Sequence, residues 1–465
     1  MKSIALQQFD RATADTAADG LRRDFVRTAL AGYYNVRGAT QAMYADYPAA
    51  RDTAAEIKWR ALENLGDYLV EFERKLLSRG VHVHWAADAE SARNYVLAVL
   101  KRRGARLVVK SKTMTSEEIH LNEAMERAGY AVVESDLGEL IVQLNHEPPY
   151  HFVFPSMHLK RGEIKSIFDR SIGRLDSDDP QALTMAARRE LRMKYLQADV
   201  GISGANFGIA ELGAIAITEN EGNSRLTCAM PKVHIALMGI EKIIPRLADL
   251  ALLQPMLATC GTGQLLTCYN SLYTAPRRAG EPDGPEEMHV VLLDNRRTHI
   301  LADPQLRDSL RCIRCGACLN VCPIFKNIGG HSYGVTYQGP IGAVIEPNLR
   351  DIGKFGHLSY ASSLCGACTE TCPVKIDLHH HLLRNRAAAA RAAKDPAERW
   401  LMQAFGFVMR RPWLLSWIGK VMRLFDRVAA PMQGTRVDPF AAWRSSRTLP
   451  KTPRHTFKDW WKTRQ

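Results

Sequence analysis

Seven of the ten cysteines lie between Cys312 and Cys372, and their spacing is the feature of the sequence that most clearly could do chemistry. The first four form the motif C-x2-C-x2-C-x3-C-P, with Cys312, Cys315, Cys318 and Cys322 followed by Pro323. In bacterial ferredoxins, the first three thiolates of this motif bind one four-iron cluster and the fourth binds a neighbouring cluster. A zinc site would use four ligands, usually as two separated pairs. The motif therefore predicts iron–sulfur chemistry.

The other three cysteines of this region repeat the end of the same pattern: Cys365, Cys368 and Cys372, followed by Pro373. The first cysteine of a complete second motif would stand at position 362, where the sequence has Ser362. Two-cluster ferredoxins exchange their fourth ligands between motifs. The predicted ligands of cluster 1 are therefore Cys312, Cys315, Cys318 and Cys372. Those of cluster 2 are Cys322, Cys365 and Cys368.

Cluster 2 has one thiolate fewer than a complete four-iron site needs. We expect a 4Fe–4S cluster at both sites, with serine, water or another residue on the fourth iron of cluster 2. A three-iron cluster is the alternative, and the sequence leaves both open. Clusters transfer single electrons and need a further cofactor or a specialised site to oxidise an organic substrate. Since the sequence has neither a strand–GxGxxG–helix fingerprint nor a P-loop, an electron-transfer component is predicted.

The segments before the cysteines have the pattern of an α/β domain that follows a helical region. Residues 1–69 are predicted to be helical, with apolar residues at helical spacing: Ile57, Ala61, Leu65, Leu69 and Phe72. From about residue 70, amphipathic stretches alternate with short β-branched runs at 106–110, 131–135, 139–144, 214–218, 234–238 and 289–293. This alternation predicts a mostly parallel sheet that is covered by helices on both faces.

Two further features of this α/β region predict local structure or binding. Thr115 and Glu118 have the spacing of a capping box, which predicts a helix that ends near Gly129. The glycine-rich stretch 201–222 could bring its backbone close to a ligand while its acids bind the ligand or abstract a proton. Tight turns alone are the alternative explanation of the glycines. The candidate ligand residues are Asn206, Glu211, Gly213 and Glu219.

Taken together, these segments resemble the lactate utilization protein B family of bacterial iron–sulfur proteins. The resemblance lies in GISGANFGIAELGAIAITENEGNSR, PKVHIALMGIEKIIP, CIRCGACLNVCP, GGHSYGVTYQGPIGAV and SLCGACTETCPVKIDLH. It implies a LUD domain similar to the NagB/RpiA/CoA-transferase-like fold, a mainly α-helical two-cluster ferredoxin domain and a helical, basic C-terminal region. The family's cluster ligands correspond to the seven cysteines, and the absence of a cysteine at position 362 also fits the family. Two companion proteins, A and C, are implied as partners.

We therefore expect an N-terminal helical region (1–69), a LUD α/β domain (70–300), a 4Fe–4S dicluster ferredoxin-type domain (301–385) and a basic, Trp-rich C-terminal domain (386–465). The predicted function is iron–sulfur electron transfer in a multi-protein system that oxidises L-lactate to pyruvate and allows growth on lactate. The alternative is a catalytic LUD domain whose clusters are internal electron relays. The sequence assigns no catalytic residue.

Composition and charge narrow these alternatives. The chain of 465 residues has no apolar run that approaches the roughly 18 residues of a membrane span, and acids near its N-terminus argue against a signal peptide, so a cytoplasmic protein is expected. Residues 395–465 hold 14 Lys and Arg against 5 Asp and Glu, and six of the eight Trp. Because the basic charge is confined to this tail, a nucleic-acid partner is not predicted. We expect the tail to bind a companion protein, with peripheral membrane contact as the alternative.

Overall fold

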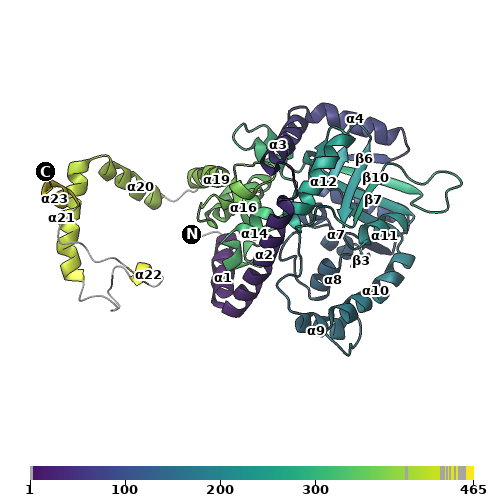
Figure 1. Ribbon diagram of the computed structural model, residues 1–465, viewed down its shortest axis with the longest axis horizontal. Coiled ribbons are helices and arrows are strands. Elements are labelled where there is room, and N and C mark those ends of the chain that lie inside the picture. Colours follow the sequence, from purple (N-terminus) through teal and green to yellow (C-terminus); the bar gives the residue numbers. More distant parts are fainter. Residues whose placement is uncertain are drawn as a thin grey trace. The chain divides into compact units, whose positions relative to one another are not determined.

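The computed structural model describes residues 4–392, 396–429, 435, 438, 441–444, 447–448 and 457–464. The chain divides into two compact units, Met1–Ala392 and Ala393–Gln465, which are described separately. The first unit contains every residue of the two cysteine motifs (Figure 1).

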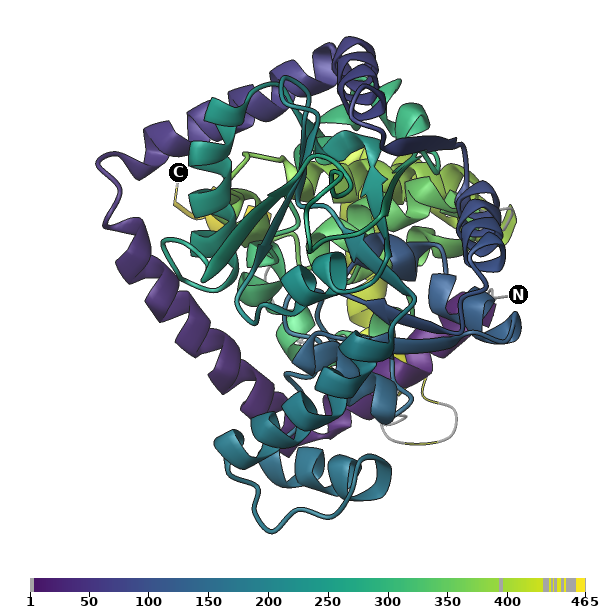
Figure 2. The ribbon, with the colours of Figure 1, turned by 90° about the vertical axis from the view of Figure 1, so that its right-hand side faces the viewer.

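Residues 4–69 lie mainly in helices, and the helices continue to the first strand. They are α1 (Ile4–Ala18), α2 (Gly20–Gln41), α3 (Tyr47–Glu63) and α4 (Leu65–Leu77). The side chains of Asp19 and Asp46 accept hydrogen bonds from backbone N–H groups in the first turns of α2 and α3, which satisfies donors that a helix leaves free. Figure 2 shows α2 and α3, in purple, as long helices along the outside of the first unit. Helices α1 and α2 pack against the cysteine region.

A six-stranded parallel sheet forms the centre of the α/β region, which confirms the predicted sheet type. In spatial order its strands are β1 (His82–Ala86), β10 (Glu287–Leu293), β7 (Val233–Gly239), β4 (Val200–Gly204), β2 (Leu107–Lys110) and β3 (Ala131–Glu134). The central strands are almost entirely buried, as expected of a parallel sheet that is covered on both faces.

Helices cover both faces of this sheet (Figure 1). One face packs on α5 (Ala89–Arg102) and α7 (Leu121–Arg127). The other face packs on α4 beside β7 and β10, and beside β2 and β3 it packs on three helices: α8 (Leu137–Leu144), α9 (Arg161–Ser171) and α10 (Pro180–Gln197). A short helix, α11 (Asn223–Ala229), lies against β4.

A second, four-stranded sheet lies against α12 (Leu247–Gly261) in the same unit (Figure 1). Its strands, in spatial order, are β8 (Ile243–Ile244), β5 (Phe207–Ile209), β6 (Ala214–Glu219) and β9 (Tyr269–Tyr273). Strands β5, β6 and β9 are antiparallel, and a 3-10 helix, η1 (Ile240–Lys242), links β7 to β8. This sheet contains the part of the glycine-rich stretch that runs from β5 to the end of β6, whereas the first residues of the stretch lie in β4.

Two local predictions were wrong. Residues 139–144 belong to helix α8, because the Asp136 side chain caps the Glu139 N–H, and a short apolar run has no periodicity that separates a strand from a buried helix. The proposed capping box is absent, because α6 (Met114–Glu118) begins one residue before Thr115. The helix is interrupted at His120, whose backbone is left-handed with φ 50°, and α7 begins after it. The carboxylate of Glu118 instead forms a buried ion pair with Arg297.

The cysteine region is built from short helices that surround the two motifs. The helices are α13 (Arg297–Leu301), α14 (Ala317–Val321), α15 (Phe325–Ile328), α16 (Gly339–Leu349), α17 (Ile352–Phe355), α18 (Ala367–Thr371) and α19 (Leu378–Ala392). The 3-10 helices are η2 (Arg307–Arg311), η3 (His331–Tyr333) and η4 (Gly356–Tyr360). Both motifs turn in the same way, because Gly316 and Gly366 precede α14 and α18 with φ of 78° and 82°, a conformation that glycine adopts without strain.

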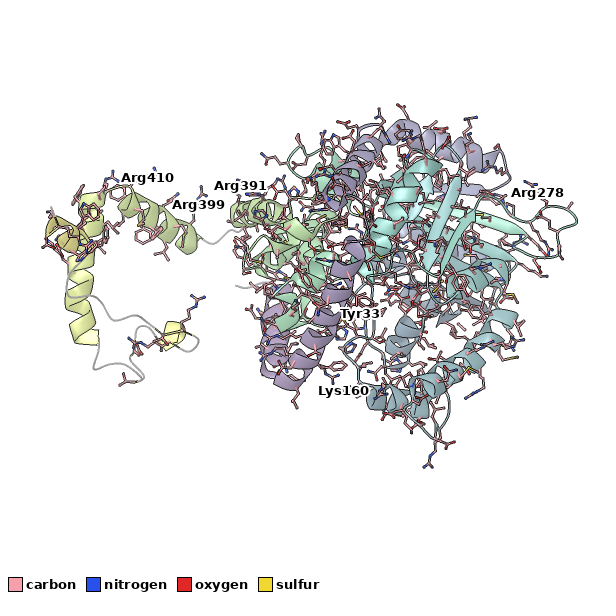
Figure 3. The ribbon with its side chains drawn as sticks, viewed as in Figure 1. Tyr33, Lys160, Arg278, Arg391, Arg399 and Arg410 are labelled. Carbon is pink, nitrogen blue, oxygen red and sulfur yellow. The ribbon has the colours of Figure 1, made fainter. Side chains whose placement is uncertain are left out.

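The second unit is helical in its described part, with α20 (Pro396–Met409), α21 (Pro412–Ala429), α22 (Ala441–Arg444) and α23 (Phe457–Lys462). Figure 3 labels Arg399 and Arg410, two exposed cations of α20 and the turn that follows it. Five tryptophans of this unit are exposed: Trp400, Trp413, Trp417, Trp460 and Trp461. Among the described residues, no helix has the length and apolarity needed to cross a membrane.

Candidate iron–sulfur site

The predicted ligands of cluster 1 meet in one small cavity, although they come from two separate motifs. The cavity is lined by Cys312, Cys315, Cys318 and Cys372. Its other walls are mainly apolar, with Ile313, Ile341 and Ile376 among them. Three of the four cysteines are buried, and Cys312 is partly buried.

The donor set of this cavity fits an iron–sulfur cluster. Burial, and then the nearby Cys312, raise the pKa of the Cys318 thiol well above its usual value, and burial also raises the pKa of Cys372 to about 12. Without a metal these thiols would stay protonated, whereas metal binding displaces the protons and stabilises the thiolates. Backbone N–H groups already point at two of the sulfurs, from Arg314 to Cys312 Sγ at 3.4 Å and from Ile376 to Cys372 Sγ at 3.4 Å.

The predicted ligands of cluster 2 also lie near one another, closer to solvent. Burial and the neighbouring Cys322 raise the pKa of Cys368 to about 11, and Cys365 interacts with both. Cys365 is exposed, while Cys322 and Cys368 are buried. The Ser362 hydroxyl accepts a hydrogen bond from the Leu364 N–H at 3.1 Å, which keeps this serine within the same loop. The predicted ligands of cluster 2 therefore include an exposed thiol, whereas those of cluster 1 are buried or partly buried.

A further thiol, Cys260, lies beside the predicted ligands of cluster 1. Cys228 and Cys260 are buried and Cys268 is exposed, and the Cys260 thiol interacts with that of Cys315. The Tyr47 hydroxyl lies 3.2 Å from Cys260 Sγ, so the helices α3 and α12 both contribute to the surroundings of the first motif. A single cysteine outside a motif gives no sequence signal of such a contact.

We expect Cys260→Ala to lower the midpoint potential of cluster 1. The Cys260 thiol can donate to the Cys315 thiolate, and a hydrogen bond to a ligand sulfur favours the more negative, reduced cluster. A hydrogen bond of about 0.5–1.5 kcal/mol corresponds to about 20–60 mV for one electron. A redox titration followed by electron paramagnetic resonance measures the shift, with Cys228→Ala as the buried control. Equal potentials in the two variants would show that Cys260 does not act on the cluster.

The candidate ligand residues of the glycine-rich stretch separate into two pairs. Asn206 and Glu219 line a cavity beside the first cysteine motif. Glu211 instead accepts a hydrogen bond from the Leu247 N–H at 3.0 Å, and Gly213, with φ 59°, packs on Lys75. The second pair has a structural role, so only half of the predicted loop faces the cavity.

Sequence reasoning missed a buried polar network that joins the α/β region to the cysteine region. The Arg297 guanidinium binds both carboxylate oxygens of Glu118, at 2.9 and 2.7 Å, and Glu241 Oε2 at 2.5 Å. The Tyr337 hydroxyl donates to Glu118 at 2.8 Å, and Arg314 reaches Glu241 Oε1 at 3.3 Å. All five side chains come from separate parts of the chain, so only the fold brings them together.

Comparison with known proteins agrees with this architecture. Family models match residues 69–293 as "LUD domain", residues 308–376 as "4Fe-4S dicluster domain" and residues 378–465 as "Lactate utilisation protein B, C-terminal". Lactate utilization protein B of Bacillus velezensis is 40% identical over 474 residues, which cover 99% of this chain and 99% of that protein. The chain belongs to the lactate utilization protein B family.

Other members of the family show the same extent of similarity. Lactate utilization protein B of Geobacillus kaustophilus is 42% identical, with 96% of each chain covered. A solved structure of a DUF162 family protein from Deinococcus radiodurans aligns with 49% of this chain and 98% of its own, with 14% identity and a TM-score of 0.28, values too low to support an inference. The family assignment confirms the predicted resemblance.

Proposed function

We propose that this chain is the iron–sulfur electron-transfer component of a multi-protein system that oxidises L-lactate to pyruvate. The observation that carries the proposal is the convergence of four cysteines from two motifs on one cavity, within a family named for lactate utilization. When bound, the two clusters would supply one-electron transfer. We further propose a NagB/RpiA/CoA-transferase-like fold for the LUD domain, domain boundaries near residues 70, 300 and 385, and a cytoplasmic location.

The residues around the two proposed clusters suggest different roles for them. Cluster 1, held by Cys312, Cys315, Cys318 and Cys372, would lie against the LUD domain. Cluster 2, held by Cys322, Cys365 and Cys368 with a non-cysteine fourth position, would have its exposed side at Cys365. Because electron transfer between proteins needs a short path through the surface, we propose that cluster 2 exchanges electrons with a companion protein.

Companion proteins A and C are the proposed partners, and the second unit is the proposed docking surface. Its exposed tryptophans and its excess of Lys and Arg combine the residues enriched at interface centres with charges that speed association with an acidic partner. Membrane contact is the alternative, since α21 carries aromatic, aliphatic and basic residues.

Truncation after Ala392 is expected to leave both clusters assembled and to weaken complex formation with the companion proteins. This position is chosen because α19 continues through Arg386, whose side chain donates to the Ser359 and Ser362 carbonyls. Rising salt should also weaken assembly of the intact chain, since exposed charges are screened. Size-exclusion chromatography at two salt concentrations measures both effects. Salt-insensitive assembly by the truncated chain would rule out this surface, and binding to anionic vesicles alone would favour the membrane.

Genetic complementation tests the function itself. A bacterial strain that has lost its own copy of this protein should regain growth on L-lactate when it receives the intact chain, and should not regain it with Cys372→Ser. Growth on pyruvate should be the same in all strains, because pyruvate lies after the proposed step. Full growth on L-lactate without the chain, or with the variant, would contradict the proposal.

A further inference from the structure

A cavity of about 370 Å³ lies between the LUD domain and the first cysteine motif. Residues that follow the carboxyl ends of four parallel strands line it: Lys112 after β2, Asp136 after β3, Asn206 after β4 and Lys242 after β7. Arg314, Cys315 and Tyr337 of the cysteine region form the opposite wall. In parallel α/β sheets, ligands bind at the carboxyl ends of the strands. The position of the cavity therefore matches that of a ligand site. One of the residues that line it, Cys315, is a predicted ligand of cluster 1.

The wall beside the cysteine motif carries positive charge that the protein neutralises only in part, since Arg314 pairs with Glu241 through one nitrogen, Nη2. Lys242 is 8% exposed, and its ammonium group has no hydrogen bond or ion pair within the described part of the chain. The Arg314 side chain is 10% exposed, and its Nε and Nη1 atoms are buried without a partner among the described residues. An unpaired buried donor is costly, so such groups in a cavity wall are suited to binding an anion.

The acids nearby do not remove this excess. Glu241 is shared between Arg297 and Arg314, and Glu118 binds the Arg297 guanidinium through both of its oxygens, so these two acids face the cations Arg297, Arg314 and Lys242. The ammonium of Lys58 is also buried there, and it donates to the Glu241 carbonyl at 2.6 Å. Burial, and then the neighbouring Arg314, lower the pKa of Lys242 to about 8, which is the direction expected where cations outnumber anions.

The far side of the cavity is acidic. Asp136, Glu219 and Glu221 line it, and they outnumber the nearby cation Lys112, whose ammonium donates to the Val153 carbonyl at 2.6 Å. Both oxygens of Glu219 accept backbone N–H groups, from Ser224 at 2.6 Å and Arg225 at 2.9 Å, so this carboxylate is committed to capping α11. Burial and Asp136 raise the pKa of Glu221 to about 7. A ligand with one carboxylate can bind the cationic wall, whereas a second carboxylate would meet this acidic side.

We propose that the cavity binds a small organic monocarboxylate, with its carboxylate between Lys242 and Arg314 and its other atoms beside Cys315. The choice of L-lactate or pyruvate as this acid rests on the proposed function. The site would hold the acid next to the residues that bind cluster 1, so that occupancy of the LUD domain and the state of the cluster are coupled.

Isothermal titration of the anaerobically purified holoprotein with L-lactate, with pyruvate and with succinate tests the inference. We expect saturable binding of at least one monocarboxylate, at least tenfold weaker binding of succinate, and at least tenfold weaker monocarboxylate binding by Lys242→Met. Lys101→Met, on the exposed surface of α5, is the matched control and should bind as the parent does. Visible absorbance and iron content show whether each variant retains its clusters.

Glu221→Gln gives a second test on the opposite wall, should Lys242→Met lose its clusters. Removing this acid is expected to bring the binding affinity for succinate closer to that for the monocarboxylates. Binding of neither monocarboxylate by the parent, or equal binding by the parent and a cluster-containing Lys242→Met, would overturn the inference. If L-lactate still reduces the clusters in a mixture with the companion proteins, the proposed function would survive that result and only the site would be lost.

Discussion

Cys372→Ser is expected to destroy the cluster of the first motif and to remove about half of the bound iron, as one of two four-iron clusters is lost. The serine would stand in the cavity that Cys312, Cys315 and Cys318 line, although it belongs to the second motif. Cys322→Ser should have the reciprocal effect on the cluster of Cys365 and Cys368. Iron analysis and electron paramagnetic resonance of the reduced proteins distinguish the two losses, because each variant should retain a different signal.

Cys268→Ser is the control for these variants, since Cys268 is exposed and outside the cavity. It should keep the full iron content and both signals. If Cys372→Ser instead removed the signal that depends on Cys365 and Cys368, the two motifs would not exchange ligands. The ferredoxin-type assignment of the cysteines would then be wrong.

Arg297→Met is expected to lower the free energy of unfolding by about 3–5 kcal/mol, the usual cost of breaking a buried ion pair. It would leave the carboxylates of Glu118 and Glu241 buried without their main partner. Burial alone would raise the pKa of Glu118, but Arg297 outweighs it and holds this pKa below its usual value. The ion pair therefore contributes stability at a pH above the usual pKa of a glutamate. This contribution is lost as the pH falls and Glu118 takes up a proton.

Urea denaturation of the anaerobic holoprotein, at neutral and at acidic pH, measures this effect. Arg296→Met is the matched control, because the neighbouring Arg296 is exposed and has the same side chain. The free energies of unfolding of the two variants should differ strongly at neutral pH and less at acidic pH. Equal unfolding midpoints at neutral pH would show that the network does not hold the two regions together.

The sequence predicted those parts of the molecule that depend on local pattern. Strands β2, β3, β6, β7 and β10 were found from short β-branched runs, while β1 and β4 were missed because His, Trp and Gly interrupt them. The assignment of Cys372 to the cluster of the first motif was predicted from chemistry, because the fourth cysteine of a ferredoxin-type motif binds the cluster of the other motif. The structure places Cys372 in the cavity that Cys312, Cys315 and Cys318 line, and the ligand exchange itself stays a prediction.

The remainder depends on contacts between residues far apart in the chain, which no local pattern records. Lys242 lies in the apolar segment PKVHIALMGIEKIIP, where nothing indicates that its ammonium group faces a cavity. Glu118 had the spacing of a capping box, yet tertiary pairing with Arg297 determines its position. For the same reason, the contact between Cys260 and Cys315 could not be predicted from either segment alone.

Anaerobic mixing of the purified chain with companion proteins A and C and L-lactate tests the proposed function most directly. The visible absorbance of the clusters follows their reduction, and each protein is omitted in turn. We predict that L-lactate reduces the clusters in the complete mixture and that the chain alone is not reduced. Clusters that dithionite reduces but L-lactate leaves oxidised in the complete mixture would contradict the proposal that this chain transfers electrons from L-lactate.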